Sequence, residues 1–395
     1  MEGISKLSKF LVVGGAGNVG EIVIKYLIKQ SDVEEVICGD INLEKAKTLA
    51  KTLGDDRIKV EWVDASNIDS LCWAMRNVDV VIAALPPPTE LLLNTIEAAF
   101  ESGCHYVDFG STFTVLFHLF NISSILRNTG LTALTCIGAA PGLTDIFAKF
   151  ASEKLDKIER IHIRDGAITI GKGVFSTYSP IVFIEECITK GWIYENGELK
   201  RVMPLTGKEI YNFPNPIGEL PVYYVSHEEP ITIPKGLDKE VGFVDFKLAM
   251  TNDTITVLKA LENFGIFNVK PIEIKGVKIS PIEFFLKTIK SPSEVAGRIK
   301  GHECLVAEVI GEKGRKKVER RVFTYMTHEE AYKRFKSTAT AYLSGVSGAM
   351  AALMIARGEI AHRGTVVPAQ LDAEKMLKEL KKVGIEVKEE VRELE

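Results

Sequence analysis

A glycine-rich turn that follows a short apolar run is the feature that most constrains the fold of this chain. Phe10–Val13 is apolar throughout, as in a buried parallel strand, and residues 21–29 place apolar side chains on one helical face. Between them, three glycines have the GxGxxG spacing, which allows a tight turn, close approach of the backbone to a pyrophosphate and tight helix packing. We therefore predict a dinucleotide-binding turn at a helix N-terminus, formed by Gly15, Ala16, Gly17, Asn18, Val19 and Gly20.

The first 145 residues alternate strand-like and helix-like segments. Further strands are predicted at 36–40, 60–63, 78–85, 105–108 and 131–136, with helices at 42–53, 90–102 and near 122–128. This alternation is typical of a doubly wound parallel sheet, the Rossmann fold. We therefore predict an α/β protein whose residues 1–145 form an N-terminal Rossmann domain.

The pattern changes after residue 146. Strand-like segments at 160–164, 241–250 and 304–310 are separated by longer connections that contain proline, which predicts a second α/β domain with a mostly antiparallel sheet over 146–336. Residues 337–357 are rich in Ala, Gly, Ser and Met and predict a buried helix. The charged tail, 373–395, predicts an amphipathic helix broken at Gly384.

Composition narrows the kind of partner. The formal net charge of −4 disfavours a nucleic-acid polyanion, which requires a basic surface. We expect no membrane span, which needs an apolar stretch of about 18 residues, and no signal peptide. The six cysteines lie far apart with no CxxC pair, as in reduced cytoplasmic thiols. The sequence therefore predicts a cytoplasmic protein that acts on small molecules, with no nucleic-acid or membrane partner.

Asp40 bears on the identity of the dinucleotide. It lies 20 residues beyond Gly20 at the end of the second predicted strand, where a carboxylate accepts hydrogen bonds from the adenosine ribose hydroxyls. The same carboxylate repels a 2′-phosphate, and neither Ile41 nor Asn42 is an arginine that could bind one. NAD is therefore favoured over NADP, although the nearby cation of Lys45 is an argument for NADP.

Other cofactor contacts are expected where the predicted strands end. Asp64 and Ala65 follow the third strand and are expected to flank the adenine, although Asp64 is equally consistent with an ordinary carboxylate before a helix. Leu85 and Pro86 follow the fourth strand, and Pro141 follows the sixth. These three residues are expected to line the nicotinamide side.

Three residues are candidates for the chemistry. Asp108 ends the fifth strand, where an acid can bind an amine or relay a proton, with a loop-capping role as the alternative. His227 and Glu228 lie on a predicted loop and are candidates for substrate contact and proton transfer. His105 and Cys136 are expected to be structural. The seven histidines show no metal-ligand spacing, so no metal site is predicted.

Several short motifs, in their order and spacing, resemble those of the saccharopine dehydrogenase family, which includes saccharopine reductases, L-lysine 6-dehydrogenases and carboxynorspermidine dehydrogenases. The resemblance runs through most of the chain. The motifs are residues 13–20, 63–65, 106–108, 138–142, 178–180 before 185–186, 196–198, 278–281, 344–349 and 358–368. The chain departs from the family pattern at Asp165-Gly166, where members often have two glycines, and at Tyr178, where they often have tryptophan.

The resemblance implies a Rossmann domain and an inserted domain, 146–336, that forms the substrate site and the contact of a homodimer. It also implies C-terminal helices, 337–395, that return to the first domain, and hydride exchange between a nicotinamide and a carbon bonded to nitrogen. Residues 39–45 are closer in character to the NAD-dependent lysine 6-dehydrogenases. Residues 227–229 and 300–304 are closer to the carboxynorspermidine branch.

We therefore predict an NAD-dependent oxidoreductase that acts on the CH–NH bond of a lysine-type amino acid, such as L-lysine or saccharopine. Arg164 and Lys172 are candidates to bind the substrate carboxylate. Three alternatives stay open: a carboxynorspermidine dehydrogenase-like polyamine enzyme, a homospermidine synthase-like transferase that retains NAD as a prosthetic group, and a non-catalytic NAD-sensing protein.

Overall fold

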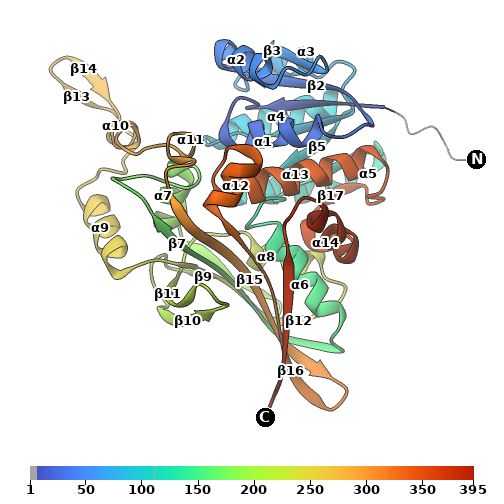
Figure 1. The fold of residues 1–395 in the computed structure, drawn as a ribbon, viewed down its shortest axis with the longest axis vertical. Coiled ribbons are helices and arrows are strands. Elements are labelled where there is room, and N and C mark those ends of the chain that lie inside the picture. Colours follow the sequence, from blue (N-terminus) through green and yellow to red (C-terminus); the bar gives the residue numbers. More distant parts are fainter. Residues whose placement is uncertain (1–6, 111) are drawn as a thin grey trace, which may run out of the picture. The chain divides into compact units, whose positions relative to one another are not determined.

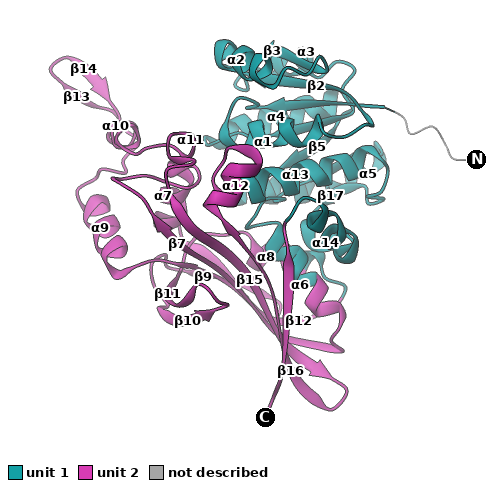
Figure 2. Cartoon of the chain, viewed as in Figure 1, with its two compact units in different colours: residues 1–149, 235–238, 341–384 teal, residues 150–234, 239–340, 385–395 magenta. Residues whose placement is uncertain are grey.

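The structure, a computed structural model, describes residues 7–110 and 112–395. The contacts among these residues divide the chain into two compact units (Figure 2). The first unit comprises the described residues up to 149 together with 235–238 and 341–384. The second comprises 150–234, 239–340 and 385–395.

The first unit is built on a parallel sheet with, among the described residues, seven strands in the order β17-β6-β5-β4-β1-β2-β3 (Figure 1). The strands are β1 (Ser8–Val13), β2 (Val33–Asp40), β3 (Ile58–Trp62), β4 (Val80–Ala83), β5 (His105–Asp108), β6 (Thr132–Leu134) and β17 (Gly364–Val366). All neighbours pair in parallel, and the order runs outward from β1 in both directions. The predicted doubly wound sheet is confirmed.

Helices connect these strands, as a parallel sheet requires. They are α1 (Asn18–Leu27), α2 (Leu43–Leu53), α3 (Ile68–Ala74), α4 (Thr89–Glu101) and α5 (Phe113–Asn128), whereas α6 (Leu143–Glu153) follows β6 and leads to β7 of the second sheet. Helix α5 begins well before the predicted segment near 122–128. Its first turns are rich in aromatic and β-branched residues, which have modest helix propensity, but Val115, Leu116 and Leu119 are fully buried. Tertiary packing therefore extends this helix.

Helix α13 (Ala339–Ala356) corrects the expectation that no segment of the chain is long and apolar enough to span a membrane. It is 18 residues long with a mean hydropathy of 1.5, so by length and composition it meets the requirement for a membrane span. However, 83% of it is buried within the protein, and its small residues pack closely. Gly345, for example, leaves no room for a Cβ, which would lie 2.6 Å from the Cβ of Ile22. The helix therefore has the packing of a core helix, as predicted for residues 337–357.

The second unit is built on a sheet that has nine strands in the described part of the chain. Its main path is β10-β11-β12-β7-β15-β16-β18, and β8 joins β12 to β9. The strands are β7 (Lys157–Ile170), β8 (Gly191–Glu195), β9 (Glu198–Val202), β10 (Glu209–Phe213), β11 (Gly218–Tyr224), β12 (Val241–Ala249), β15 (Lys300–Lys313), β16 (Lys316–Thr327) and β18 (Val387–Leu394). Strands β7 and β12 pair in parallel and the other pairs are antiparallel, which confirms the mostly antiparallel sheet.

The pairing of the strands shows which side chains lie on the same face of this sheet. Side chains alternate between faces along a strand, so Ile163 and Asp165 share one face and Arg164 lies on the other. Ile163 pairs with Phe246 of β12, which places Phe246 on the face of Asp165. Glu303 of β15, two residues before the partner of Asp165, is on that face as well.

The remaining helices connect or flank the second sheet. They are α7 (Pro180–Ile188), α8 (Glu229–Gly236), α9 (Asn252–Asn263), α10 (Pro281–Thr288), α11 (Pro292–Val295) and α12 (His328–Phe335). A separate hairpin consists of β13 (Ile272–Ile274) and β14 (Val277–Ile279).

The C-terminal segment differs from its prediction. Helix α14 (Ala373–Lys382) forms as expected, after a short 3-10 turn at Pro368–Gln370. Beyond Gly384, however, the tail is strand β18, which pairs with β16 of the second sheet, so residues 385–395 belong to the second unit. The charged sequence suits this position, because β18 is an edge strand and charged side chains protect such an edge from further pairing.

Candidate active site

The glycine-rich turn ties the start of α1 to the first two strands. The backbone N–H groups of Gly14 and Gly15 donate to the carbonyl of Gly39, at 2.9 and 3.0 Å. A Cβ on Gly20 would lie 2.3 Å from the carbonyl oxygen of Gly14, and one on Gly15 would lie 2.8 Å from the Sγ of Cys38. These two glycines are therefore required by packing alone.

The N-terminus of α1 fits a bound anion. Gly17 is the N-cap residue and, having no side chain, makes no capping hydrogen bond to the first turn. A Cβ on Gly17 would meet a single backbone oxygen, that of Gly14 at 3.0 Å, and Asn18 and Val19 are half-buried. The uncapped N–H groups and the helix dipole together favour a phosphate here. The geometry thus suits the pyrophosphate of the predicted dinucleotide.

Asp40 lies at the end of β2, directly beside this turn. One carboxylate oxygen accepts a hydrogen bond from the backbone N–H of Ala16 at 3.0 Å, and the other accepts from Asn42 at 2.8 Å. Each carboxylate oxygen can accept a second hydrogen bond, and the residue is half-buried. Asp40 therefore orders the turn and retains the capacity to bind ribose hydroxyls.

The other predicted cofactor residues occupy the same edge of the sheet in different ways. Asp64 accepts hydrogen bonds from the backbone and hydroxyl of Ser66, which lower the pKa of its carboxyl, so it also serves as a turn-forming acid before α3. Ala65 is buried. The Leu85 side chain would be 3.5 Å from a Cβ on Gly14, so it lies against the glycine turn, whereas Pro86 is exposed.

Pro141 and Asp108 are both buried within the first unit. Pro141 follows a cis peptide bond, and its carbonyl accepts from Gly138 at 2.7 Å. The Asp108 carboxylate accepts from the Thr135 hydroxyl at 2.9 Å, from the Cys136 N–H at 2.9 Å and from the Gly110 N–H at 3.2 Å. Through these contacts Asp108 fixes the loops after β5 and β6. This is the loop-capping role that the sequence analysis gave as the alternative for Asp108.

The His227 segment of the second unit brings together the other candidate residues. His227 Nδ1 is hydrogen-bonded to Glu229, and its Nε2 lies 3.9 Å from an oxygen of Glu186 on α7. The Tyr178 hydroxyl donates to the other Glu186 oxygen at 2.6 Å. His227 and Glu229 are buried, and Glu228 is half-buried. One imidazole is therefore surrounded by carboxyl groups from two segments of the chain.

The pKa values of Glu186, His227 and Glu228 are all raised. Burial raises the pKa of Glu186 to about 7 and that of Glu228 to about 8. Burial would lower the pKa of His227, but the carboxylates of Glu229, Glu186 and Glu228 raise it to about 10. At neutral pH the imidazole is therefore a cation, while two neighbouring carboxyls can gain or lose a proton. Such values suit general acid–base chemistry.

A second carboxyl pair lies on the same face of the sheet as Phe246. Burial, followed by the charge of Glu303, raises the pKa of Asp165 well above its usual range. Burial likewise raises the pKa of Glu303 to about 7, and the Thr340 hydroxyl donates to its carboxyl group. His227, Glu186 and Glu229 also influence Asp165 electrostatically. We call His227 and its carboxyl neighbours, together with this pair, the acidic cluster: Asp165, Glu186, His227, Glu228, Glu229 and Glu303.

The acidic cluster contains a possible donor set for a cation. One ligand atom from each of His227, Glu228 and Glu229 lies within 4.8 Å of the others, a grouping that the spacing of the histidines did not predict. The Nδ1 of His227 is already hydrogen-bonded to Glu229, however, and Nε2 faces Glu186. Both nitrogens of His227 therefore already face a carboxyl group, and the same residues form an acid–base group without a cation.

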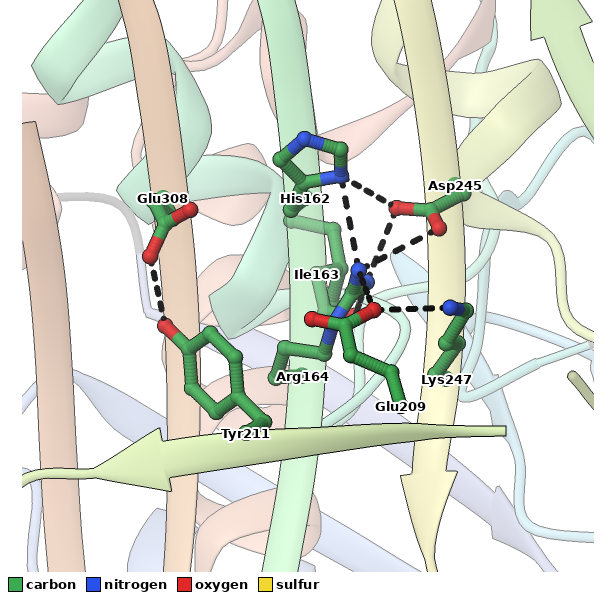
Figure 3. A network of polar contacts seen from close by, with 8 residues as sticks. All are labelled: His162, Ile163, Arg164, Glu209, Tyr211, Asp245, Lys247 and Glu308. Carbon is green, nitrogen blue, oxygen red and sulfur yellow. Dashed lines mark hydrogen bonds and ion pairs between the residues drawn. The ribbon is translucent and has the colours of Figure 1, made fainter. Parts of the chain in front are cut away.

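Arg164 does not bind a substrate carboxylate, contrary to the expectation from the sequence. Its side chain is 2% exposed and lies on the opposite face of the sheet, where it is paired with Asp245 at 2.8 Å and with Glu209 at 3.1 Å (Figure 3). His162 and Lys247 complete this ionic network. The guanidinium is thus already neutralised. Lys172 is exposed in the loop after β7.

Sequence reasoning located part of the acidic cluster and missed the rest. His227 and Glu228 were predicted, and the structure places them at its centre. Glu186, Tyr178 and Glu303 lie in motifs that carried the family resemblance, but no catalytic role was given to them. A signal was available at Asp165, which replaces a glycine of the family pattern with an acid.

Together, the doubly wound sheet, the GxGxxG turn at a helix N-terminus and the acid ending the second strand define a nicotinamide dinucleotide-dependent oxidoreductase. Comparison with protein families specifies it further. Residues 10–134 match the saccharopine dehydrogenase NADP binding domain, and residues 138–385 match the saccharopine dehydrogenase C-terminal domain. The chain therefore belongs to the saccharopine dehydrogenase family of NAD(P)-dependent dehydrogenases.

Individual relatives cover nearly the whole chain. It is 24% identical over 389 residues to carboxyaminopropylagmatine dehydrogenase of Synechocystis sp., with 96% of each chain covered. It is 26% identical over 400 residues to carboxynorspermidine synthase of Vibrio cholerae, with 94% of each covered. The apo histidine-tagged saccharopine dehydrogenase (L-Glu forming) from Saccharomyces cerevisiae matches with a TM-score of 0.71 at 16% identity, covering 98% of this chain and 100% of the other. This last likeness confirms the fold.

Proposed function

We propose that this enzyme transfers hydride between a nicotinamide cofactor and the C–N bond of a polyamine derivative that carries a carboxyl group. The acidic cluster is the observation that carries this proposal. Burial and the charges of neighbouring carboxyls raise the pKa values of Asp165, Glu186 and Glu228, so the negative potential of the cluster favours a cationic ligand. The names of two relatives, carboxyaminopropylagmatine dehydrogenase and carboxynorspermidine synthase, support the same class of substrate.

The lysine-type substrate that the sequence put first is the second candidate. L-Lysine also ends in an amine that the acidic cluster would accept. Saccharopine carries several carboxylates, which need cationic partners, and the buried cation Arg164 is committed to Asp245 and Glu209. A polycationic substrate is therefore the better match to the charges of the second unit.

In the proposed reaction, the bound nicotinamide accepts or donates the hydride. The protein must hold the reacting nitrogen as a neutral amine, because a protonated nitrogen has no lone pair to expel hydride. We assign the proton transfer to Glu228, whose pKa of about 8 is close to working pH. His227 positions this carboxyl by its charge, and Tyr178 and Glu186 hold the other side of the imidazole. Asp108 is a positioning residue for the loops that flank the cofactor turn.

We further propose NAD as the preferred dinucleotide. The Asp40 carboxylate is held in place by Ala16 and Asn42, and a charge fixed there repels a 2′-phosphate. The matching family domain is described as NADP binding, so the preference is a property to be measured for this chain. We also propose that the enzyme is cytoplasmic and works as a homodimer.

The test is the appearance of reduced cofactor, followed by absorbance, with purified protein, NAD or NADP, and five amines. The amines are carboxynorspermidine, carboxyaminopropylagmatine, saccharopine, L-lysine and ornithine. Reduction with a carboxylated polyamine and not with saccharopine supports the proposal, whereas reduction with L-lysine or saccharopine alone overturns the polyamine assignment. NAD binding shown by a thermal shift, with no reduction by any amine, would favour the transferase alternative if the protein also retains NAD through purification.

A further inference from the structure

Asp165 lies at the centre of the acidic cluster, because its strand β7 runs between β12 and β15 in the second sheet (Figure 1). On one side, Glu303 of β15 pairs with Ala167, so it is the diagonal neighbour of Asp165 on the same face. On the other side, Phe246 of β12 shares this face, and its ring is stacked against the imidazole of His227. The carboxyl of Asp165 therefore has a second carboxyl on one side and the imidazole on the other.

The protein gives the Asp165 carboxyl no partner within the described part of the chain. No group there donates a hydrogen bond to it, and no cation forms an ion pair with it. Its neighbour in sequence, Arg164, lies on the opposite face and is paired with Asp245. Asp165 is nevertheless only half-buried, and Ala167, further along the same face of β7, is exposed. Asp165 is thus an acid without a countercharge on a part of the sheet that a ligand can reach.

An ammonium group is the ligand that matches Asp165 and Glu303 together. Diagonal neighbours on paired strands are roughly 7–8 Å apart, so two acidic side chains in these positions can both contact one small cation. An ammonium supplies the missing positive charge and three N–H donors, whereas a carboxylate of the ligand would be repelled. One oxygen of Glu303 accepts a hydrogen bond from the Thr340 hydroxyl, which holds this carboxyl in place. The pair therefore favours an amine that has no carboxylate next to it.

We infer that Asp165, together with Glu303, binds an ammonium group of the substrate that does not react, and so selects substrates with a second amine. The reacting nitrogen then lies at Glu228, so binding and proton transfer use different carboxyls of the acidic cluster. This inference rests on the proposed function, because both concern the same substrate. It also separates the two candidate substrates: the second ammonium of L-lysine is next to a carboxylate, which Asp165 and Glu303 would repel, whereas a polyamine has a second ammonium on a plain methylene chain.

The test is calorimetric titration with putrescine, which has an ammonium at each end, and with n-butylamine, which has the same chain and one ammonium. The wild-type chain should bind putrescine at least about tenfold more tightly, the effect of one charge-assisted hydrogen bond. Asp165→Asn should bind the two amines equally, and Asp165→Glu, which keeps the charge, should retain part of the preference. Asparagine has the shape of the neutral carboxyl that the raised pKa gives Asp165 in the free protein, so this variant is expected to fold.

Glu308→Gln is the matched control. It removes a carboxylate from the same sheet, but Glu308 pairs with His162 of β7, so its side chain lies on the face opposite Asp165. This variant should keep the full preference for putrescine.

Enzyme kinetics provide a second measurement, which separates binding from chemistry. With carboxynorspermidine, Asp165→Asn should raise KM by about ten- to a hundredfold and leave kcat nearly unchanged. Putrescine that binds the wild-type chain no more tightly than n-butylamine, or an Asp165→Asn variant that keeps the preference, overturns the inference. If the wild-type chain then still oxidises carboxynorspermidine, the proposed function stands without Asp165. A preference for putrescine that depends on Asp165, with no cofactor reduction by any amine, supports Asp165 as an ammonium-binding residue and contradicts the proposed hydride transfer.

Discussion

The imidazole of His227 lies flat against the phenyl ring of Phe246, with ring centroids 3.7 Å apart and ring planes inclined by 4°. Phe246 is buried on β12, so the sheet fixes the position of the imidazole while Glu229 holds its Nδ1. A cation stacked on an aromatic face and surrounded by carboxyls has little reason to lose its proton. This fixed charge lowers the pKa of Glu228 against the effect of burial and so sets the pH at which that carboxyl can accept a proton.

Replacing Glu228 tests whether it accepts the proton. In the wild-type enzyme, the rate of amine oxidation should rise with pH through about 8, as Glu228 loses its proton. In Glu228→Gln the rate should fall by about 100-fold or more, the usual contribution of general base catalysis, and the rise near pH 8 should disappear. The measurement is kcat between pH 6 and 10. If kcat of the variant still rises near pH 8, Glu228 is not the proton acceptor.

Asp108→Asn provides the contrast for that experiment. The amide keeps one oxygen for the N–H groups of Cys136 and Gly110, but it loses the charge and places its NH2 group against the Thr135 hydroxyl, so we expect a lower melting temperature. The rise of kcat near pH 8 should be retained in the fraction of the variant that folds. If the rise of kcat near pH 8 is lost while the melting temperature is unchanged, Asp108 rather than Glu228 transfers the proton.

The acidic cluster also predicts how stability depends on pH. Glu186, Glu228 and Glu303 have folded pKa values of about 7, 8 and 7, above their ordinary value of 4.5. The folded state therefore binds protons more tightly than the unfolded state, and stability should fall as pH rises from about 4.5 through 8. His227 acts in the same direction, because its pKa rises from 6.5 to about 10, so its contribution is lost as pH rises from about 6.5 through 10.

Thermal melting between pH 5 and 9 checks this expectation. Glu303→Gln should flatten the decline, because it removes one buried carboxyl that costs stability when ionised. Glu393→Gln is the control, since Glu393 is 58% exposed in a surface pair with Lys316. Stability that rises with pH over this range would contradict the prediction.

Cofactor preference should depend on Asp40. Asp40→Asn removes the negative charge next to the ribose, so KM for NAD should rise and KM for NADP should fall. We expect changes of roughly ten- to a hundredfold, since a charge-assisted hydrogen bond contributes about 1.5–3 kcal/mol. Asp64→Asn should leave the ratio of the two KM values nearly unchanged. If both variants alter that ratio equally, the discrimination is not specific to Asp40.

The buried ion pair between Arg164 and Asp245 should be required for folding of the second unit. Both side chains are 2% exposed, and the Arg164 guanidinium holds the pKa of Asp245 well below its usual range against the effect of burial. Asp245→Asn leaves the Arg164 cation buried with weaker compensation, which should cost about 3–5 kcal/mol. Denaturant unfolding measures this loss. Glu393→Gln, in an exposed pair, should cost less than about 1 kcal/mol.

Local sequence was sufficient for the first unit and for its cofactor turn. Gly15, Gly20 and Asp40 lie within a single β1–α1–β2 unit, so their spacing in the sequence is enough to predict their positions. The acidic cluster was only partly predictable, because its residues come from four separate segments, of which strand pairing joins only β7 and β15. Arg164 shows the same limit, since only the strand register reveals that it and Asp165 lie on opposite faces.

The C-terminal tail shows how tertiary context overrides local preference. Its run of Glu, Lys and Val suits a helix as well as a strand, and the amphipathic pattern of α14 just before it favoured a longer helix. The outcome depended on the open edge of β16, which lies far away in sequence. Contacts of this kind decide strand formation and are not visible in a local window.

Both sheets take their last strand from the end of the chain, and this order has a consequence for synthesis. The first sheet is complete only when β17 has left the ribosome, after residue 366, and the second only when β18 follows, after residue 394. The nascent chain therefore carries an unfinished first sheet until residue 366, and from β7 onward it carries a second unfinished sheet as well. A protein arranged in this way depends on rapid folding after release, or on chaperones during elongation, more than one whose first domain closes early.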